Sequence, residues 1–206
     1  MPGPDTSPDW LTELLRRGRC PDPAEPWRPP PSRSARAAVA RDVHDGLLRR
    51  LAGDVVVAAG TGVDAAVRAR SLALLVPAGA VVVGVAAAWV HVGAPLPAPQ
   101  QVQVVRRTPT RYAPTGGVRL VASRCRLETE DVTEVAGLAL TTPARTLLDL
   151  ARSDPRRAVQ VRALLTAAGA DGAEVERAAL RARGRAHVRT ARRALAVGAA
   201  PVVPRP

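Results

Sequence analysis

The feature of the sequence that most constrains the fold is the stretch 71–105, which contains no Asp, Glu, Lys or Arg. So long a stretch without a charge is buried, either in a membrane or in the core of a globular domain. Six residues that disfavour a continuous helix interrupt or close it: Pro77, Gly79, Gly84, Pro95, Pro97 and Pro99. His91 lies inside it, and Ala and Gly favour membrane insertion less than Leu and Ile do. We therefore expect no membrane span, but a helix, a turn and a second buried element in a globular core.

The residues around this stretch alternate between helical and strand patterns. Residues 64–76 predict a helix that Pro77 stops, with Arg68 off its apolar face, and residues 85–92 predict a buried helix that carries Trp89. Three further segments predict strands, the last of them a pair joined by a tight turn: 101–105, 117–123 and 131–142. Helices follow from Pro143 and over 154–169, 171–183 and 185–197. This order predicts an α+β fold with a small sheet and C-terminal helices.

The N-terminal part predicts a separate small module. Residues 1–32 are Pro-rich, and we expect one short helix there over residues 7–18. We expect residues 198–206 to be a disordered tail. Residues 33–60 predict a helix, a tight turn, a second helix and a strand, the order of a winged-helix-like module whose second helix enters the major groove of DNA. We expect four residues to contact the DNA: Arg41, His44, Arg49 and Arg50.

The chain carries a formal net charge of +12, and all 30 of its Lys and Arg residues are Arg. Without Lys, neither a P-loop nor Schiff-base chemistry is available. Coding bias in GC-rich genes explains Arg in place of Lys, but it does not explain the excess of positive charge, which favours a polyanionic partner. Two acid-free segments, 106–126 and 177–193, are either solvated faces or a nucleic-acid or acidic-partner surface. The candidates for this secondary basic surface are Arg106, Arg107, Arg185, Arg189, Arg192 and Arg193.

The cysteines and histidines predict no metal site and no disulfide framework. Cys20 and Cys125 lie far apart in the sequence, as do His44, His91 and His187. This usage favours a reducing cytoplasm, and the N-terminus lacks the basic and apolar regions of a signal peptide. We expect no cofactor.

Arg145 and Asp149 stand out in the otherwise apolar segment "LTTPARTLLDL". Thr142 predicts the helix N-cap and Pro143 the first helical residue, so the two charged residues lie one turn apart on a helix. An Arg–Asp pair without a nucleophile, a base or a metal cluster disfavours catalysis. Two roles stay open for the pair: bracing of neighbouring strands, and docking of a protein partner.

The order of these motifs resembles a known family. The segments "RLAGDVVVA", "VRARSLALLVPAGAVV", "QVQVVRR" and "DVTEVAGLALTTPARTLLDLAR" succeed one another as in the AbiEi family of type IV antitoxins. The similarity extends over residues 33–197, and "LTTPARTLLDL" is its most specific piece. It is greatest to a subgroup that often carries a C-terminal endonuclease-like domain of the very-short-patch-repair type, which this sequence lacks.

The resemblance implies a non-enzymatic, cytoplasmic DNA-binding regulator. Residues 33–60 would bind inverted repeats in double-stranded DNA at the operon's own promoter, and residues 61–197 would form the α/β antitoxin domain acting against a nucleotidyltransferase-like toxin. No membrane and no small-molecule substrate are expected. An alternative stays open: a non-catalytic interaction module that remains from a longer protein after loss of its endonuclease-like domain.

Overall fold

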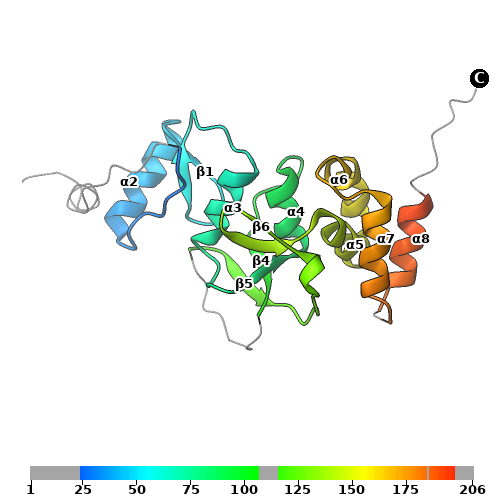
Figure 1. Cartoon of the computed structure of the whole chain (residues 1–206). Coiled ribbons are helices and arrows are strands. Elements are labelled where there is room, and N and C mark those ends of the chain that lie inside the picture. The colour runs from blue at the N-terminus through cyan, green and yellow to red at the C-terminus, as the bar shows by residue number, and fades with distance from the viewer. Residues whose placement is uncertain (1–23, 107–115, 185, 198–206) are drawn as a thin grey trace, which may run out of the picture.

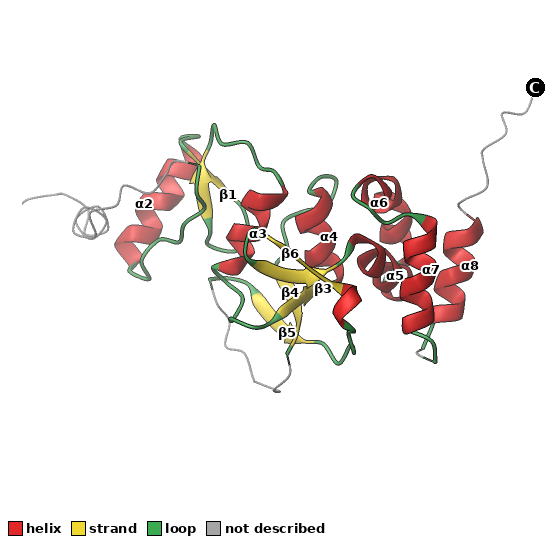
Figure 2. Ribbon diagram, in the orientation of Figure 1, coloured by secondary structure: helices red, strands yellow, loops and turns green. Residues whose placement is uncertain are grey.

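The structure is a computed structural model of the 206-residue chain and describes residues 24–106, 116–184 and 186–197. Figures 1 and 2 show three parts in a row: helix α2 (Arg33–His44) with a small hairpin, a central sheet with helices α3 (Ala65–Ala73) and α4 (Gly84–Val92), and a C-terminal group of helices. The mixed helices and strands confirm an α+β fold. No helix among the described residues is long and apolar enough to cross a membrane.

The central sheet has five strands in the order β5-β4-β3-β7-β6. Their bounds are β3 Val81–Val83, β4 Gln101–Val105, β5 Arg119–Ala122, β6 Val132–Val135 and β7 Leu138–Thr141. β3 pairs parallel with β7 and antiparallel with β4, and β4 pairs parallel with β5. The pattern of β4 is as predicted, because Val102 and Val104 are buried whereas Gln101 and Gln103 are exposed.

The uncharged stretch forms the middle of the core. Helix α4 confirms the buried helix predicted there, with Trp89 among its buried residues. Directly before it lies β3, the central strand of the sheet, which the sequence did not predict. Val82 and Val83 are both buried, so the strand shows no alternation of polar and apolar residues.

The prediction that Arg68 lies off the apolar face of α3 is wrong, because this residue is buried and only 8% exposed. Its guanidinium donates hydrogen bonds to the carbonyl oxygens of Val63 at 2.8 Å, Val90 at 3.1 Å and His91 at 3.4 Å. Two of these carbonyls belong to the last turn of α4, where no intrahelical donor remains. A Cβ added to Gly93 would lie 2.7 Å from Nη1 of Arg68, so the Gly lets the guanidinium approach the end of α4.

In the N-terminal module, the second helix that the sequence predicts is absent from the described residues, and a strand takes its place. Residues Leu48–Arg50 form strand β1, which pairs antiparallel with β2 (Val56–Ala58), and Trp27 bridges to β2 from the other side. The chain turns from α2 into β1 at Gly46, whose φ is +75°. Leu47, which begins the apolar spacing of the predicted second helix, is 64% exposed. The short helix predicted over residues 7–18 lies outside the described residues. The winged helix is not confirmed, because a strand stands where its second helix was predicted, and the domain boundaries stay predictions.

The hairpin is fixed to the sheet through Gly53 and Gly116, where the two backbones meet. The N–H of Asp54 donates to the carbonyl of Gly116 at 2.7 Å, and the Asp54 carboxylate pairs with Arg28 at 2.9 Å. A Cβ on Gly53 would collide with the Gly116 carbonyl and lie 2.7 Å from Val118. The contact therefore depends on Gly53, whose φ is also positive, at +56°.

The C-terminal helices are α5 (Pro143–Ser153), α6 (Pro155–Ala167), α7 (Gly172–Arg181) and α8 (Val188–Val197). They confirm the predicted starts of α5 and α6 and, to within one residue, that of α7, whereas α8 begins at residue 188 and not at 185. The side chains of Thr142 and Asp154 cap α5 and α6, each followed by Pro in the first turn. Helix α5 packs against α4, α6, α7 and α8, which places the "LTTPARTLLDL" segment between the sheet and the other helices.

Candidate functional site

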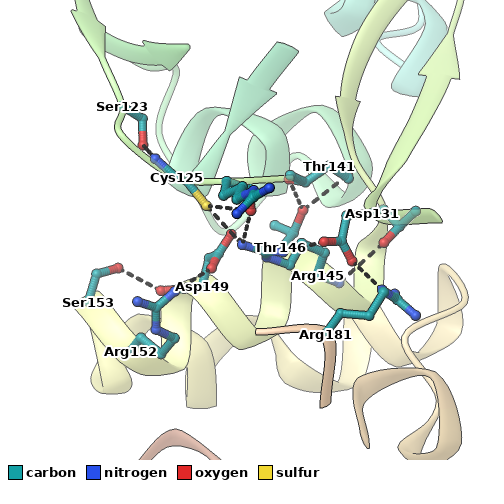
Figure 3. Close-up of polar contacts among 12 residues, drawn as sticks. Ser123, Cys125, Asp131, Thr141, Arg145, Thr146, Asp149, Arg152, Ser153 and Arg181 are labelled. Carbon is teal, nitrogen blue, oxygen red and sulfur yellow. Dashed lines mark hydrogen bonds and ion pairs between the residues drawn. The ribbon is translucent and has the colours of Figure 1, made fainter. Parts of the chain in front are cut away.

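Arg145 is completely buried on α5, with 0% of its side chain exposed. Its guanidinium forms ion pairs with Asp131 and, at 3.0 Å, with Asp149. It also donates to Sγ of Cys125 at 2.8 Å and to the carbonyl of Arg126 at 3.3 Å. Figure 3 shows these groups converging on the guanidinium from the sheet side and from α5. One side chain thus connects the loop after β5, the turn before β6 and α5.

The ion pairs continue on both sides of Arg145. Asp131, at the end of a short 3-10 helix (Thr129–Asp131), also binds Arg181 of α7 at 2.8 Å. Asp149 also binds Arg152 at 3.0 Å, and Arg152 Nε donates to the carbonyl of Ala186 between α7 and α8. We call this chain of five alternating charges the ion-pair network: Arg181, Asp131, Arg145, Asp149 and Arg152.

The electrostatics of the network keep Arg145 charged. Burial opposes the charge, but Asp149, Cys125 and Asp131 outweigh it and raise the pKa of Arg145 above its ordinary value. These contacts join the loop after β5, the turn before β6 and α5, as expected of a bracing role. The docking role stays a prediction. Sequence reasoning missed Asp131, whose 0% exposure no local pattern indicates.

Next to the network, Thr141, Thr146 and His91 join β7, α5 and α4. The hydroxyls of Thr141 and Thr146 lie 2.7 Å apart, and Thr146 also donates to the Thr141 carbonyl at 3.1 Å. Nε2 of His91 lies 2.8 Å from the same carbonyl, and it must carry the proton because a carbonyl only accepts. Burial, together with the charge of Arg68, lowers the pKa of His91 below its ordinary value of 6.5, although the bond to Thr141 raises it.

The lowered pKa of His91 predicts a loss of stability in mild acid. The unfolded chain takes up a proton near pH 6.5 while the folded state resists it, so the unfolded state binds more protons and stability falls as the pH falls below that value. The slope for one proton is at most about 1.4 kcal/mol per pH unit. We expect urea midpoints that decrease from pH 7.5 to 5.5 in the wild type and decrease less in His91→Gln. The exposed His44→Gln is the matched control and should retain the full decrease; an equal decrease in both variants would contradict the assignment.

A cleft of about 740 Å³ lies beside the network. Its walls come from the β3–α4 junction, β4, the loop after β5, the C-terminal half of α5 and the connection between α7 and α8. Three Arg residues line it, Arg124, Arg126 and Arg152, and Asp149 is its one acidic lining residue. The cleft is therefore net positive.

The predicted DNA-contacting residues all lie on the N-terminal module, in an arrangement different from the one expected. Arg41 and His44 are exposed in the last turn of α2, and Arg49 and Arg50 are exposed on strand β1, not on a recognition helix. Arg49 donates to the carbonyl of Thr61, and Arg50 to that of Gly53 at 3.4 Å. The structure places the four residues within one helix–turn–strand segment, and their contact with DNA stays a prediction.

The secondary basic surface divides into unequal parts. Arg189 and Arg193 are exposed on α8, and Arg192 is paired with Glu176 of α7. Arg106 is half-buried after β4, and Arg107 and Arg185 lie outside the described residues. Figure 1 places α8 at the opposite end of the molecule from α2, so the residues on α8 do not extend the surface of the N-terminal module.

The part of the chain that the structure describes holds no group of three or more His, Cys, Asp or Glu that could bind a metal. Among protein families, the AbiEi antitoxin C-terminal domain matches residues 79–197, more than half of the chain. This range includes the ion-pair network, the cleft and all helices from α4 to α8. No curated protein and no solved structure matches the chain significantly.

Proposed function

Because this chain belongs to the AbiEi antitoxin family, we propose that it is the antitoxin of a type IV toxin–antitoxin system and acts, without catalysis, against a nucleotidyltransferase-like toxin. The observation that carries the proposal is the family match over residues 79–197. The matched range includes all five strands of the central sheet, the whole of α5 and the residues that line the cleft. A cytoplasmic location belongs to the same proposal.

Co-expression with the toxin tests the proposal that this chain is an antitoxin. Cells that carry an inducible toxin from beside this gene should stop growing on induction and recover when the chain is supplied from a second plasmid. A chain that is present at normal levels, as checked by immunoblot, and still gives no recovery would contradict the proposal.

We propose further that the N-terminal module binds the operon's own promoter. In support, α2 and β1 expose Arg41, His44, Arg49 and Arg50 within one short segment that precedes the family match. Exposed guanidinium groups bind DNA phosphates and release counterions, which makes the affinity depend on salt.

The double variant Arg49→Ala/Arg50→Ala should weaken binding to the upstream DNA and flatten its salt dependence. Each phosphate contact contributes about 0.9 to the slope of log K against log salt concentration, so we expect the slope to decrease by up to about 2. Fluorescence anisotropy titrations at salt concentrations from about 50 to about 300 mM measure this slope.

The matched control for this measurement is Arg156→Ala/Arg162→Ala, which removes the same charge from α6. It should retain the wild-type slope. If both variants change the slope equally, the DNA site is not on the N-terminal module. Weak binding without preference for the upstream DNA would instead support the alternative, a non-catalytic interaction module.

A further inference from the structure

We propose that the cleft of about 740 Å³ beside the ion-pair network binds a phosphate-bearing small molecule. This inference goes beyond the proposed function, because it assigns a ligand site to the antitoxin domain that neither toxin nor DNA requires. The volume falls within the range of about 300–1,000 Å³ that is typical of small-molecule sites.

The charges around the cleft select an anion. Its one acidic lining residue, Asp149, is already bound by Arg145 and Arg152, each at 3.0 Å, so its charge is compensated within the protein. Arg124 is exposed and makes no ion pair with any residue that the structure describes, and Arg126 extends the same loop. A phosphate entering here meets guanidinium groups, whose fork geometry suits its oxygens.

The inner wall offers hydrogen bonds in addition to charge. The Ser123 hydroxyl accepts from the N–H of Cys125 at 3.3 Å, which leaves its own proton to be donated to a ligand oxygen. The Gln103 carboxamide lies against Gly84, where an added Cβ would be 3.0 Å from Oε1. Val83 is paired with Gln103 across the two strands, so the cleft is lined by an amide and an apolar side chain as well as by the Arg residues. Figure 3 shows Ser123 on the sheet side and Asp149 and Arg152 on α5.

The ligand could be a nucleotide or a free phosphate ion, and titration distinguishes the two. Isothermal calorimetry on the full chain with ADP, pyrophosphate and inorganic phosphate should show binding by at least one of the three. If ADP binds at least about tenfold tighter than pyrophosphate, the inner wall contacts the nucleoside; equal affinities identify a site for the anion alone. Absence of heat and of thermal stabilisation with all three probes would overturn the proposal.

Variants place the binding in the cleft. Arg124→Ala/Arg126→Ala should weaken the tightest probe at least about tenfold, whereas Arg156→Ala, which removes one positive charge from α6, should leave its affinity unchanged. Should the double variant fail to fold, Ser123→Asp serves as a second test, because its carboxylate can still accept from Cys125 while repelling an anion. Unchanged affinity in a folded Ser123→Asp or Arg124→Ala/Arg126→Ala protein would contradict the site.

Discussion

Arg145→Met should destabilise the protein by about 3–5 kcal/mol, the usual cost of breaking a buried ion pair by removing one partner. The variant leaves Asp131, which is 0% exposed, with Arg181 alone, and deprives Asp149 of one of its two guanidinium partners. It also removes the donors to Cys125 and to the Arg126 carbonyl. Equilibrium unfolding in urea at pH 7 measures the loss. Because the network is buried, the loss should change little with ionic strength.

The matched control is Arg156→Met, an exposed residue of α6, which should change stability by no more than about 0.5 kcal/mol. If Arg145→Met does not fold, Arg145→Lys gives the same information, because Lys keeps the charge but cannot reach Asp131, Asp149 and Cys125 together. A loss below about 1 kcal/mol in either variant would show that the ion pairs do not brace the domain.

Gly53→Ala should separate the N-terminal hairpin from the sheet. A Cβ at this position collides with the carbonyl of Gly116, which accepts from Asp54 N–H, and the residue must also keep a φ of +56°. The backbone strain alone costs about 1–3 kcal/mol, and the collision adds to it. Hydrogen exchange should show faster exchange at Asp54 and in β2, while the amides of α5 stay protected.

Gly60→Ala is the control for this substitution, because an added Cβ there meets nothing within 4 Å. It should be close to neutral. If Gly53→Ala leaves the exchange of the hairpin unchanged, the backbone contact with Gly116 does not fix the hairpin. Measuring promoter binding by Gly53→Ala would also show whether that binding requires the N-terminal module to be held on the sheet.

The parts of the fold that were predictable from the sequence carry local signals. Thr142-Pro143 and Asp154-Pro155 mark the starts of α5 and α6 because a capping side chain and a fixed proline φ both favour a helix start. The alternation of Gln and Val predicts β4 at its observed bounds. The turn at Ala136–Gly137, with φ values of +46° and +81°, joins β6 and β7 as expected.

The parts that were not predictable depend on partners distant in the sequence. The run from Leu47 to Leu51 has helical spacing, yet it pairs with β2 once Gly46 turns the chain. Val81–Val83 is hidden in an apolar run because a strand buried on both faces lacks alternation. Arg68 was placed off the apolar face, and Asp131 was missed, because their partners, Val90 and Arg181, come from other elements.

The same dependence applies to the candidate site. Arg145 and Asp149 are visible as a pair because they lie one turn apart on α5. The cleft, by contrast, forms where the loop after β5 meets the end of α5 and the α7–α8 connection, and no single segment of the sequence shows that meeting. A net positive charge could be counted from the sequence, but its distribution between the two ends of the molecule could not.

The ion-pair network has a consequence for how such a domain can diverge over evolutionary time. Removing any one of Asp131, Arg145 or Asp149 takes at least one ion-pair partner from a buried or half-buried charge, so single replacements pass through a destabilised intermediate. Paired replacements avoid that intermediate. Positions 131, 145, 149 and 181 should therefore change together among homologous chains or not at all, whereas exposed Arg residues such as Arg156 drift independently.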